Sequence, residues 1–247
     1  MLKEMYLAMK RAHGLRGWWP VLRVGAAQDD RPTYDPARKR LTELQRFEIA
    51  VGAILTQNTA WSNVEKAMVQ LHRCGAISPK RLNVMPPPRL AKLIRSSGYF
   101  NQKARKLKAF VRFLDMKTSG VEPMNQLKRM QTRKIRAELL GVHGVGPETA
   151  DSILLYALGK PVFVVDAYTR RIFSRHGWIR GDEPYDAIRK WFEGKLPKSP
   201  RLYNEYHAQI VEIGKRNCHR RRPDCRSCPL YRRGFFESAE DFKRVMS

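Results

Sequence analysis

Apolar residues recur at a helical period along most of the chain, and this pattern predicts an all-α protein. Between residues 133 and 158 it outlines two helices joined by a tight turn. Ile135, Leu139 and Val142 share one face of the first helix. The second helix carries a broader apolar stripe, made of Ala150, Ile153, Leu154, Ala157 and Leu158. No run alternates apolar and polar residues as a half-buried strand does.

Other helices follow from the same pattern. The sequence FEIAVGAIL at 47–55 is apolar almost all round, which predicts a buried helix that ends in the loop Thr56–Thr59. The next helix is predicted to start at a capping box, Ser62 to Glu65. Gly98 to Asn101 separates two more helices. Further helices are predicted around 172–176, 185–192 and 202–215, whereas the first forty residues form a basic segment with a Pro-containing loop.

The turn between the first two helices contains Gly144-Val145-Gly146. Two glycines one residue apart permit positive φ and a close approach of the backbone to a ligand. Pro147 suits the first position of the following helix, whose N-terminal amides attract anions. The turn is therefore a candidate phosphate clamp, although an ordinary helical hairpin accounts equally well for Gly-x-Gly alone.

A carboxylate follows soon after this hairpin. The short apolar run Val162–Val165 ends at Asp166, with Arg170 and Arg171 close behind. Such a carboxylate near a phosphate clamp suggests chemistry on a nucleic acid. The alternative is that Asp166 caps the helix that begins near Tyr168.

Together, the segment LGVHGVGPETA and the following Val-Val-Asp resemble the helix-hairpin-helix (HhH-GPD) DNA glycosylases of the endonuclease III superfamily, from about Phe47 to Leu230. Within it, the chain looks most like the endonuclease III-related branch that includes 3-methyladenine DNA glycosylases. The resemblance implies two helical domains with the active-site cleft between them. Residues 41–159 would form a six-helix domain ending in the hairpin, and 1–40 with 160–247 would form the second domain, which carries a C-terminal cysteine loop.

The resemblance also implies roles for individual residues. Asp166 would be the catalytic carboxylate, and Gln57 in ILTQNTAW would fill the gap that a flipped nucleotide leaves in the duplex. The residues implied in DNA binding are Gly144, Val145, Gly146, Thr149, Gln57, Asn58, Lys103 and Arg170. The residues implied in the base pocket are Trp18, Trp19 and Pro20, with Trp61 as either a pocket wall or a hydrophobic staple. Structural packing is the ordinary alternative for each tryptophan.

Glu148 occupies the position of a lysine that, in bifunctional relatives, forms a Schiff base with the sugar and leads to strand cleavage. A glutamate cannot form one, so the sequence predicts a monofunctional enzyme without strong AP lyase activity. Glu148 itself is explained by the preference for acids in the first turn of a helix.

Three cysteines, Cys218, Cys225 and Cys228, stand in the spacing C-x6-C-x2-C. In endonuclease III relatives a fourth cysteine follows after five residues, and the four thiolates bind a [4Fe-4S] cluster. Here that position is Gly234. A cluster with a non-cysteine fourth ligand, a three-iron cluster and a cluster-free remnant are the alternatives, and a bound cluster is favoured because three correctly spaced cysteines are not expected by chance. A zinc site with the adjacent His219 fits the geometry poorly.

Charge indicates the partner. A net charge of +25 over 247 residues favours a polyanion, and the resemblance specifies double-stranded DNA with a damaged base, bound by a monomer. The N-terminus lacks the apolar core of a signal peptide, no stretch has the roughly 20 apolar residues that span a bilayer, and four cysteines do not form a secreted disulfide framework. We expect a cytoplasmic, nucleoid-associated protein without membrane contact.

The predicted function is base-excision repair, in which the enzyme flips and hydrolytically removes a damaged base. No second carboxylate is placed to act as a general acid, which favours a base that is already cationic, such as 3-methyladenine. Two alternatives remain. The enzyme would act on oxidised pyrimidines or mismatched thymine as endonuclease III-like glycosylases do, or the protein would be a non-catalytic helix-hairpin-helix DNA-binding protein.

Overall fold

The computed structural model describes residues 1–22, 31–38, 40–118, 120–238 and 240–241. The regular structure in these ranges is helical, and their β-type contact is a single bridge between Val21 and Thr33. The predicted all-α class is confirmed. No helix among the described residues is both long and apolar enough to cross a membrane.

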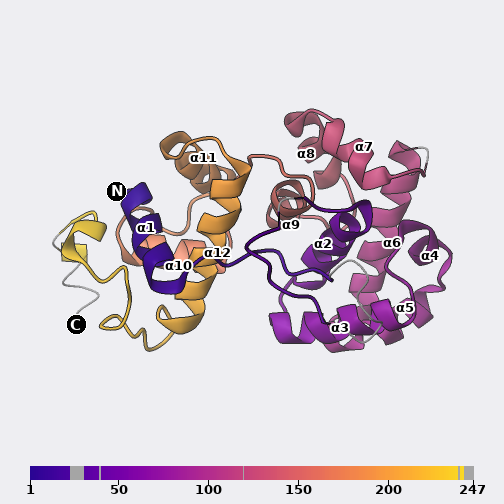
Figure 1. Cartoon of the computed structure of the whole chain (residues 1–247), viewed down its shortest axis with the longest axis horizontal. Coiled ribbons are helices and arrows are strands. Elements are labelled where there is room, and N and C mark those ends of the chain that lie inside the picture. Colours follow the sequence, from indigo (N-terminus) through magenta and orange to yellow (C-terminus); the bar gives the residue numbers. More distant parts are fainter. Residues whose placement is uncertain (23–30, 39, 119, 239, 242–247) are drawn as a thin grey trace. The chain divides into compact units, whose positions relative to one another are not determined.

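The chain divides into two compact units, a middle unit of Trp19–Lys160 and a terminal unit of Met1–Trp18 with Pro161–Ser247 (Figure 1). The middle unit contains α2 (Glu43–Leu55), α3 (Trp61–Arg73), α4 (Pro79–Val84), α5 (Pro87–Leu93), the 3₁₀ turn Arg95–Ser97, α6 (Phe100–Lys117), α7 (Pro123–Arg129), α8 (Thr132–Leu140) and α9 (Pro147–Ser152), which a π-helical turn, Ile153–Ala157, continues. The terminal unit contains α1 (Leu2–His13), α10 (Ala167–Arg175), α11 (Tyr185–Lys195), α12 (Pro200–Arg216) and the 3₁₀ turn Arg233–Phe235.

This division differs from the predicted boundary between residues 40 and 41. The segment that follows Trp19 belongs to the middle unit because its backbone bonds to α2. The Gln45 side-chain amide donates to the Leu22 carbonyl (2.8 Å), and the Leu22 N–H donates to the Glu48 carboxylate (3.1 Å). The described part of the middle unit also contains eight α-helices, α2 to α9, where six were predicted.

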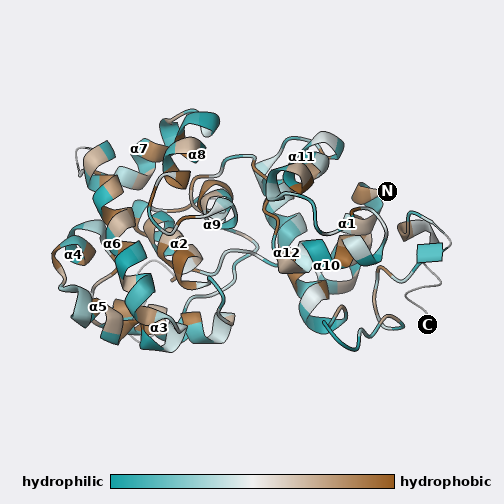
Figure 2. Cartoon of the chain, turned by 180° about the vertical axis from the view of Figure 1, so that it is seen from behind, coloured by the Kyte–Doolittle hydropathy of each residue, from teal (hydrophilic) through white to brown (hydrophobic). Residues whose placement is uncertain are grey.

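Helix α2 is the centre of the middle unit, as its apolar sequence predicts. Every residue from Gln45 to Leu55 is buried, and brown apolar stretches are visible along the α2 ribbon in Figure 2. The helix begins at a capping box in which the Thr42 side chain accepts from the Gln45 N–H and the Gln45 side chain accepts from the Thr42 N–H. A helix buried all round thus leads directly into the loop that carries Gln57.

The capping box predicted for α3 is wrong. The helix begins at Trp61, its N-cap is Ala60, and no side chain caps it. Ser62 therefore lies inside the first turn. The Glu65 carboxylate instead accepts a hydrogen bond from the Trp61 indole N–H at 2.8 Å, which fixes the orientation of that ring.

The terminal unit is assembled from both ends of the sequence. Helix α1 packs on α12 (Figure 1). At this contact the Tyr6 and Tyr206 rings stack with centroids 5.5 Å apart, and the Tyr206 hydroxyl donates to the Leu2 carbonyl. The core beside them is aromatic, with the Phe163 and Phe192 rings stacked at 4.1 Å. Because Phe163 lies three residues before Asp166, this core anchors the chain at the candidate site.

Candidate active site

The hairpin joins α8 to α9 through a turn whose two glycines play different parts. Gly144 has φ of +80°, so the expectation of positive φ is confirmed there. Gly146 is the N-cap of α9 with φ of −86°, so that expectation is wrong at Gly146. An added Cβ at Gly146 would meet nothing within 4 Å. Because Gly146 is exposed and has no side chain, a ligand can approach its backbone closely.

The backbone amides of Val145 and Gly146, two residues implied in DNA binding, also differ. The Val145 N–H donates to the Val142 carbonyl at 3.0 Å, and the Val145 side chain is buried. The Val145 amide is therefore bonded within the turn, which corrects the predicted phosphate contact of this amide. Within the described chain the Gly146 N–H makes no such bond, and it lies at the start of α9.

Gln57 is bonded to the hairpin. Its side-chain amide donates to the Gly144 carbonyl and to the Thr149 hydroxyl, both at 2.9 Å. Its carbonyl oxygen accepts from the Lys106 ammonium at 2.5 Å. The structure thus brings together three residues predicted for DNA binding, Gln57, Gly144 and Thr149, and adds Lys106. Asn58, next in the loop, is exposed and adopts φ of +51°.

Lys103 does not lie on a DNA-binding surface. It is 2% exposed, and its ammonium donates to the Leu55 carbonyl, the Thr59 hydroxyl and the Ser97 carbonyl. Burial, with a smaller effect of Lys106, lowers the pKa of Lys103 to about 8. An ammonium whose three donors are all engaged inside the protein has none left for phosphate. Lys103 joins the end of α2 to the loop behind Gln57, so its predicted DNA contact is corrected to a structural role.

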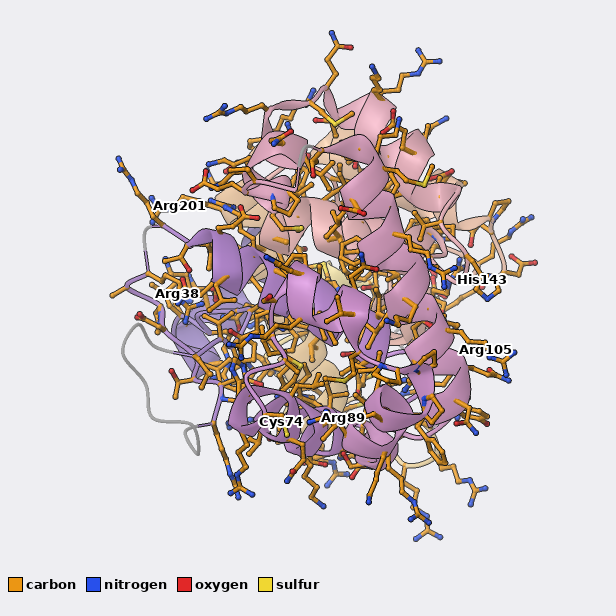
Figure 3. All side chains as sticks on the ribbon, turned by 90° about the vertical axis from the view of Figure 1, so that its right-hand side faces the viewer. Arg38, Cys74, Arg89, Arg105, His143 and Arg201 are labelled. Carbon is orange, nitrogen blue, oxygen red and sulfur yellow. The ribbon has the colours of Figure 1, made fainter. Side chains whose placement is uncertain are left out.

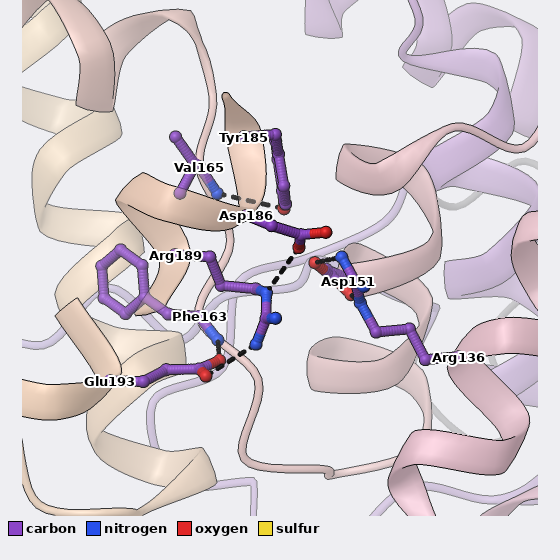
Figure 4. Close-up of polar contacts among 8 residues, drawn as sticks. All are labelled: Arg136, Asp151, Phe163, Val165, Tyr185, Asp186, Arg189 and Glu193. Carbon is purple, nitrogen blue, oxygen red and sulfur yellow. Dashed lines mark hydrogen bonds and ion pairs between the residues drawn. The ribbon is translucent and has the colours of Figure 1, made fainter. Parts of the chain in front are cut away.

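A buried ion pair joins the two helices of the hairpin. Arg136 on α8 donates two hydrogen bonds, of 2.7 and 3.0 Å, to the two carboxylate oxygens of Asp151 on α9 (Figure 4). The Asp151 side chain is fully buried, and that of Arg136 is 15% exposed. This bidentate geometry fixes the angle between the helices as well as their distance. On the outside of the unit, Arg105 of α6 and His143 of the turn point away from the ribbon (Figure 3).

Asp166 in the terminal unit is both a helix cap and a nearly buried carboxylate. Its Oδ1 accepts from the Thr169 N–H at 2.7 Å and from the Thr169 hydroxyl at 2.9 Å, which caps α10. Its Oδ2 lies 3.5 Å from His207 Nε2 on α12. Burial raises the pKa of Asp166, but His207 and the Thr169 hydrogen bonds outweigh it, and the net pKa falls below the usual value. The carboxylate is therefore ionised at neutral pH.

The run before Asp166 is held by α11. The Val165 N–H donates to the Tyr185 hydroxyl (3.3 Å), and the Phe163 N–H donates to the Glu193 carboxylate (2.9 Å; Figure 4). Arg189 pairs with that same carboxylate at 2.6 Å. These contacts satisfy two buried N–H groups of a run that has no strand partner in the described chain, and they hold the run in place just before Asp166.

Arg170 lies on α10, and its guanidinium donates to the Gly181 and Glu183 carbonyls at 3.0 and 2.8 Å. One of its nitrogens is thus committed to the following loop, and its predicted DNA contact remains a prediction. Glu148 is exposed in the first turn of α9. That location agrees with an acid favoured by the helix dipole, and the predicted lyase position of Glu148 remains a prediction.

The aromatic residues predicted to line the pocket fall in different units. Trp19 is 6% exposed and packs edge-on against Trp61, with ring centroids 5.3 Å apart. Tyr156, which the sequence reading missed, completes the cluster at 5.2 Å from Trp19. Trp18 belongs to the terminal unit, where the Lys215 ammonium lies 5.8 Å from its ring. Pro20 is buried beside Trp19 in the chain.

The close packing of Trp19 depends on Gly52 of α2, where an added Cβ would lie 3.2 Å from the Trp19 indole nitrogen. The glycine inside FEIAVGAIL therefore has a packing role that periodicity did not reveal.

The three cysteines line one hollow between α10, α12 and the C-terminal loop. The Arg175 guanidinium lies 3.1 Å from the Cys218 sulfur. The fourth position, Gly234, is exposed and offers no side chain. Across the residues that the structure describes, no three or more His, Cys, Asp or Glu side chains form a group able to hold a metal. Three thiols alone do not complete a four-thiolate cluster site.

The cysteine loop is nevertheless strongly basic. Its exposed cations, which suit phosphate contacts, are Lys215, Arg216, Arg220, Arg221, Arg222 and Arg226.

Comparisons with known proteins identify the family of the chain. The family of HhH-GPD superfamily base excision DNA repair proteins matches residues 51–198. A provisionally named DNA repair glycosylase of Methanocaldococcus jannaschii is 40% identical over 93% of this chain and 94% of its own length. Endonuclease III of Thermotoga maritima is 31% identical over 76% of this chain and 82% of its own length.

Two solved structures are also similar. A 3-methyladenine DNA glycosylase of H. pylori, bound to 1,N6-ethenoadenine, is 29% identical with a TM-score of 0.59, over 71% of this chain and 90% of that one. An endonuclease III–DNA complex shares the fold with a TM-score of 0.72 at 22% identity, over 100% of this chain and 97% of that one. The fold and these likenesses define a DNA-binding enzyme, a DNA N-glycosylase of base excision repair. The chain belongs to the HhH-GPD superfamily of base excision DNA repair proteins.

Proposed function

We propose that this glycosylase hydrolytically removes an alkylated purine such as 3-methyladenine, as a monofunctional enzyme that acts on DNA as a monomer. Two observations carry the proposal, namely a nearly buried, ionised Asp166 and a glutamate, Glu148, at the position where the resemblance implies a lyase lysine. The first supplies a negative charge for a cationic transition state. The second lacks the amine that strand cleavage requires.

Asp166 acts on the sugar rather than on the base. As the glycosidic bond breaks, positive charge develops at C1′ and the ring oxygen, and the carboxylate stabilises it. The same carboxylate orients a water molecule for attack on C1′. Since a 3-methylated purine is already cationic, it departs without a general acid. The geometry thus suits a substrate whose bond to the sugar is already weakened.

The base would stack on Trp61, the partly exposed ring of a cluster in which Trp19 and Tyr156 are buried behind it. A cationic base over such rings gains about 0.5–2 kcal/mol from cation–π attraction. The similarity to the H. pylori 3-methyladenine DNA glycosylase supports this choice of base. Trp18, which belongs to the same unit as Asp166, stays a predicted pocket residue.

The DNA backbone would be bound at the start of α9, where the Gly146 amide and the Thr149 side chain lie. Phosphate contacts of this kind orient the duplex without reading its sequence. Gln57, adjacent to both, would enter the space left by the flipped nucleotide. In the structure it is held back by the hairpin and Lys106, so it must exchange these hydrogen bonds for contacts with DNA.

An endonuclease III-like activity on oxidised pyrimidines or mismatched thymine is the second candidate, favoured by the 31% identity to endonuclease III of T. maritima. Glu148 opposes its lyase step but leaves its choice of base open. A non-catalytic DNA-binding role gains no support from the membership in a glycosylase family.

The test compares base release from methylated DNA with release from duplexes containing oxidised pyrimidine or a thymine–guanine mismatch, before and after alkali. We expect free 3-methyladenine, with strand breaks only after alkali, and no borohydride-trapped adduct. Asp166→Asn should lose base release by at least about 100-fold and keep its affinity for DNA. Release only from the other duplexes would overturn the substrate, and an active Asp166→Asn variant would overturn the mechanism.

A further inference from the structure

The two oxygens of the Asp166 carboxylate have different surroundings. Oδ1 is occupied by the N–H and the hydroxyl of Thr169, both from α10. Oδ2 faces α12, where His207 Nε2 lies 3.5 Å away. One oxygen therefore serves the helix cap, and the other stays available for charge stabilisation, next to an imidazole that belongs to a different helix.

His207 is itself nearly inaccessible. The exposed fractions of the His207 and Asp166 side chains are 6% and 12%. A carboxylate withdrawn from water is costly unless donors or a positive charge compensate it. On Oδ1, Thr169 provides two donors, and on Oδ2 the described neighbour that serves this purpose is His207.

The approach of α12 to α10 is built into the sequence. Gly214 on α12 lies against the ring of Tyr168 on α10, where an added Cβ would be 2.0 Å from a ring carbon. Arg171 on α10 reinforces the contact by donating to the Gly214 carbonyl (3.2 Å) and to the Cys218 carbonyl (2.8 Å). Without a side chain at Gly214, the two helices pack closely enough to hold His207 at Asp166.

We propose that His207 is a positioning residue for the reaction, which orients Oδ2 of Asp166 and keeps the carboxylate ionised. This inference rests on the proposed catalytic role of Asp166. In the absence of His207, a nearly buried Asp166 with one compensated oxygen takes up a proton more readily. Protonation removes the charge that the cationic sugar needs, so base release slows although the DNA contacts are intact.

The experiment measures single-turnover base release against pH, together with DNA affinity and thermal stability, for His207→Leu and His207→Gln in the full chain. The leucine variant should release base about 100-fold more slowly at neutral pH, and the acid limb of its rate profile should move to higher pH. The glutamine variant keeps a neutral N–H donor, so it should recover the rate to within about 10-fold. DNA affinity should change less than about 2-fold.

The chain offers a matched control. His72 Nε2 lies 3.4 Å from the Glu48 carboxylate, with side chains 9% and 3% exposed, in the middle unit. His72→Leu removes an equally buried pair that has no part in the reaction, so it should lower stability while leaving the rate and the acid limb unchanged.

Three results are decisive. A His207→Leu enzyme with the full rate and an unmoved acid limb, alongside an inactive Asp166→Asn enzyme, would overturn the inference alone. An active Asp166→Asn enzyme would overturn the proposed function as well. A uniform loss of rate at every pH that glutamine does not rescue would also reject positioning, because it indicates general damage to the unit.

Discussion

The replacement of Gly144 by alanine tests how the hairpin turn is built. The φ of +80° at Gly144 costs an L-residue about 1–2 kcal/mol. An added Cβ would also lie 2.3, 2.6 and 2.8 Å from Cγ, Cδ and Cε of Lys106, so the lysine stem must move. When the Lys106 stem moves, its ammonium loses the hydrogen bond to Gln57, which stabilises the fold by about 1.5–3 kcal/mol for a charged donor. The two terms give roughly 2.5–5 kcal/mol.

At about 2–4 °C per kcal/mol, this destabilisation lowers the unfolding temperature by roughly 5–20 °C. Thermal unfolding measures the total, and hydrogen exchange of peptides covering 132–157 assigns it to the hairpin. Gly146→Ala is the control. Its φ of −86° suits any residue and its Cβ meets nothing within 4 Å, so its cost should stay within about 1 kcal/mol.

A double variant separates the two causes. In a Lys106→Ala background the steric overlap is gone, so Gly144→Ala should cost only the backbone term, about 1–2 kcal/mol. Equal costs at Gly144 and Gly146, or the full cost of Gly144→Ala in the absence of the lysine, would refute this account of the turn.

Three further predictions concern buried polar groups. Lys103→Met leaves three acceptors without their donor and should destabilise the protein by about 3 kcal/mol in urea unfolding, whereas a loss of DNA affinity at unchanged stability would contradict the structural role. Arg136→Met removes the bidentate partner of buried Asp151 and should lower the free energy of unfolding by about 3–5 kcal/mol. A nearly unchanged free energy of unfolding would contradict a stabilising role for this ion pair. Burial lowers the pKa of His176 to about 4 against the opposing effect of Phe235. Below pH 6.5 the unfolded chain then binds a proton that the folded chain does not, so stability should fall by about 3 kcal/mol from pH 6.5 to 4, a slope that His176→Asn should abolish.

Local patterns in the sequence predicted what depends on local chemistry. The buried helix α2, the hairpin and the helix that starts after Asp166 follow from apolar spacing, Gly-x-Gly and capping preferences. Helix α1 was not predicted, although the helical spacing of Leu2, Met5 and Met9, which are buried, indicates it. The many basic residues of this segment made it resemble a polar, irregular stretch.

Other features depend on contacts between distant parts of the chain. Lys103 and Lys106 are similar in sequence, yet one is buried behind Gln57 and the other lies over the hairpin, and only the packing of α6 distinguishes them. His207 lies far along the chain from Asp166, and no motif links the two. Their proximity results from α10 and α12 packing at Gly214, a contact that a single sequence does not reveal.

The contact between α1 and α12 has a consequence for biosynthesis. Tyr206 bonds to Leu2 across 204 positions of the chain, and at about 5–20 residues per second a ribosome needs roughly 10–40 s to make that length. The hairpin in Trp19–Lys160 has all of its partners much earlier. During translation, therefore, the hairpin can form while the surroundings of Asp166 are still incomplete, and α1 must wait, exposed or chaperoned, for the last long helix to emerge.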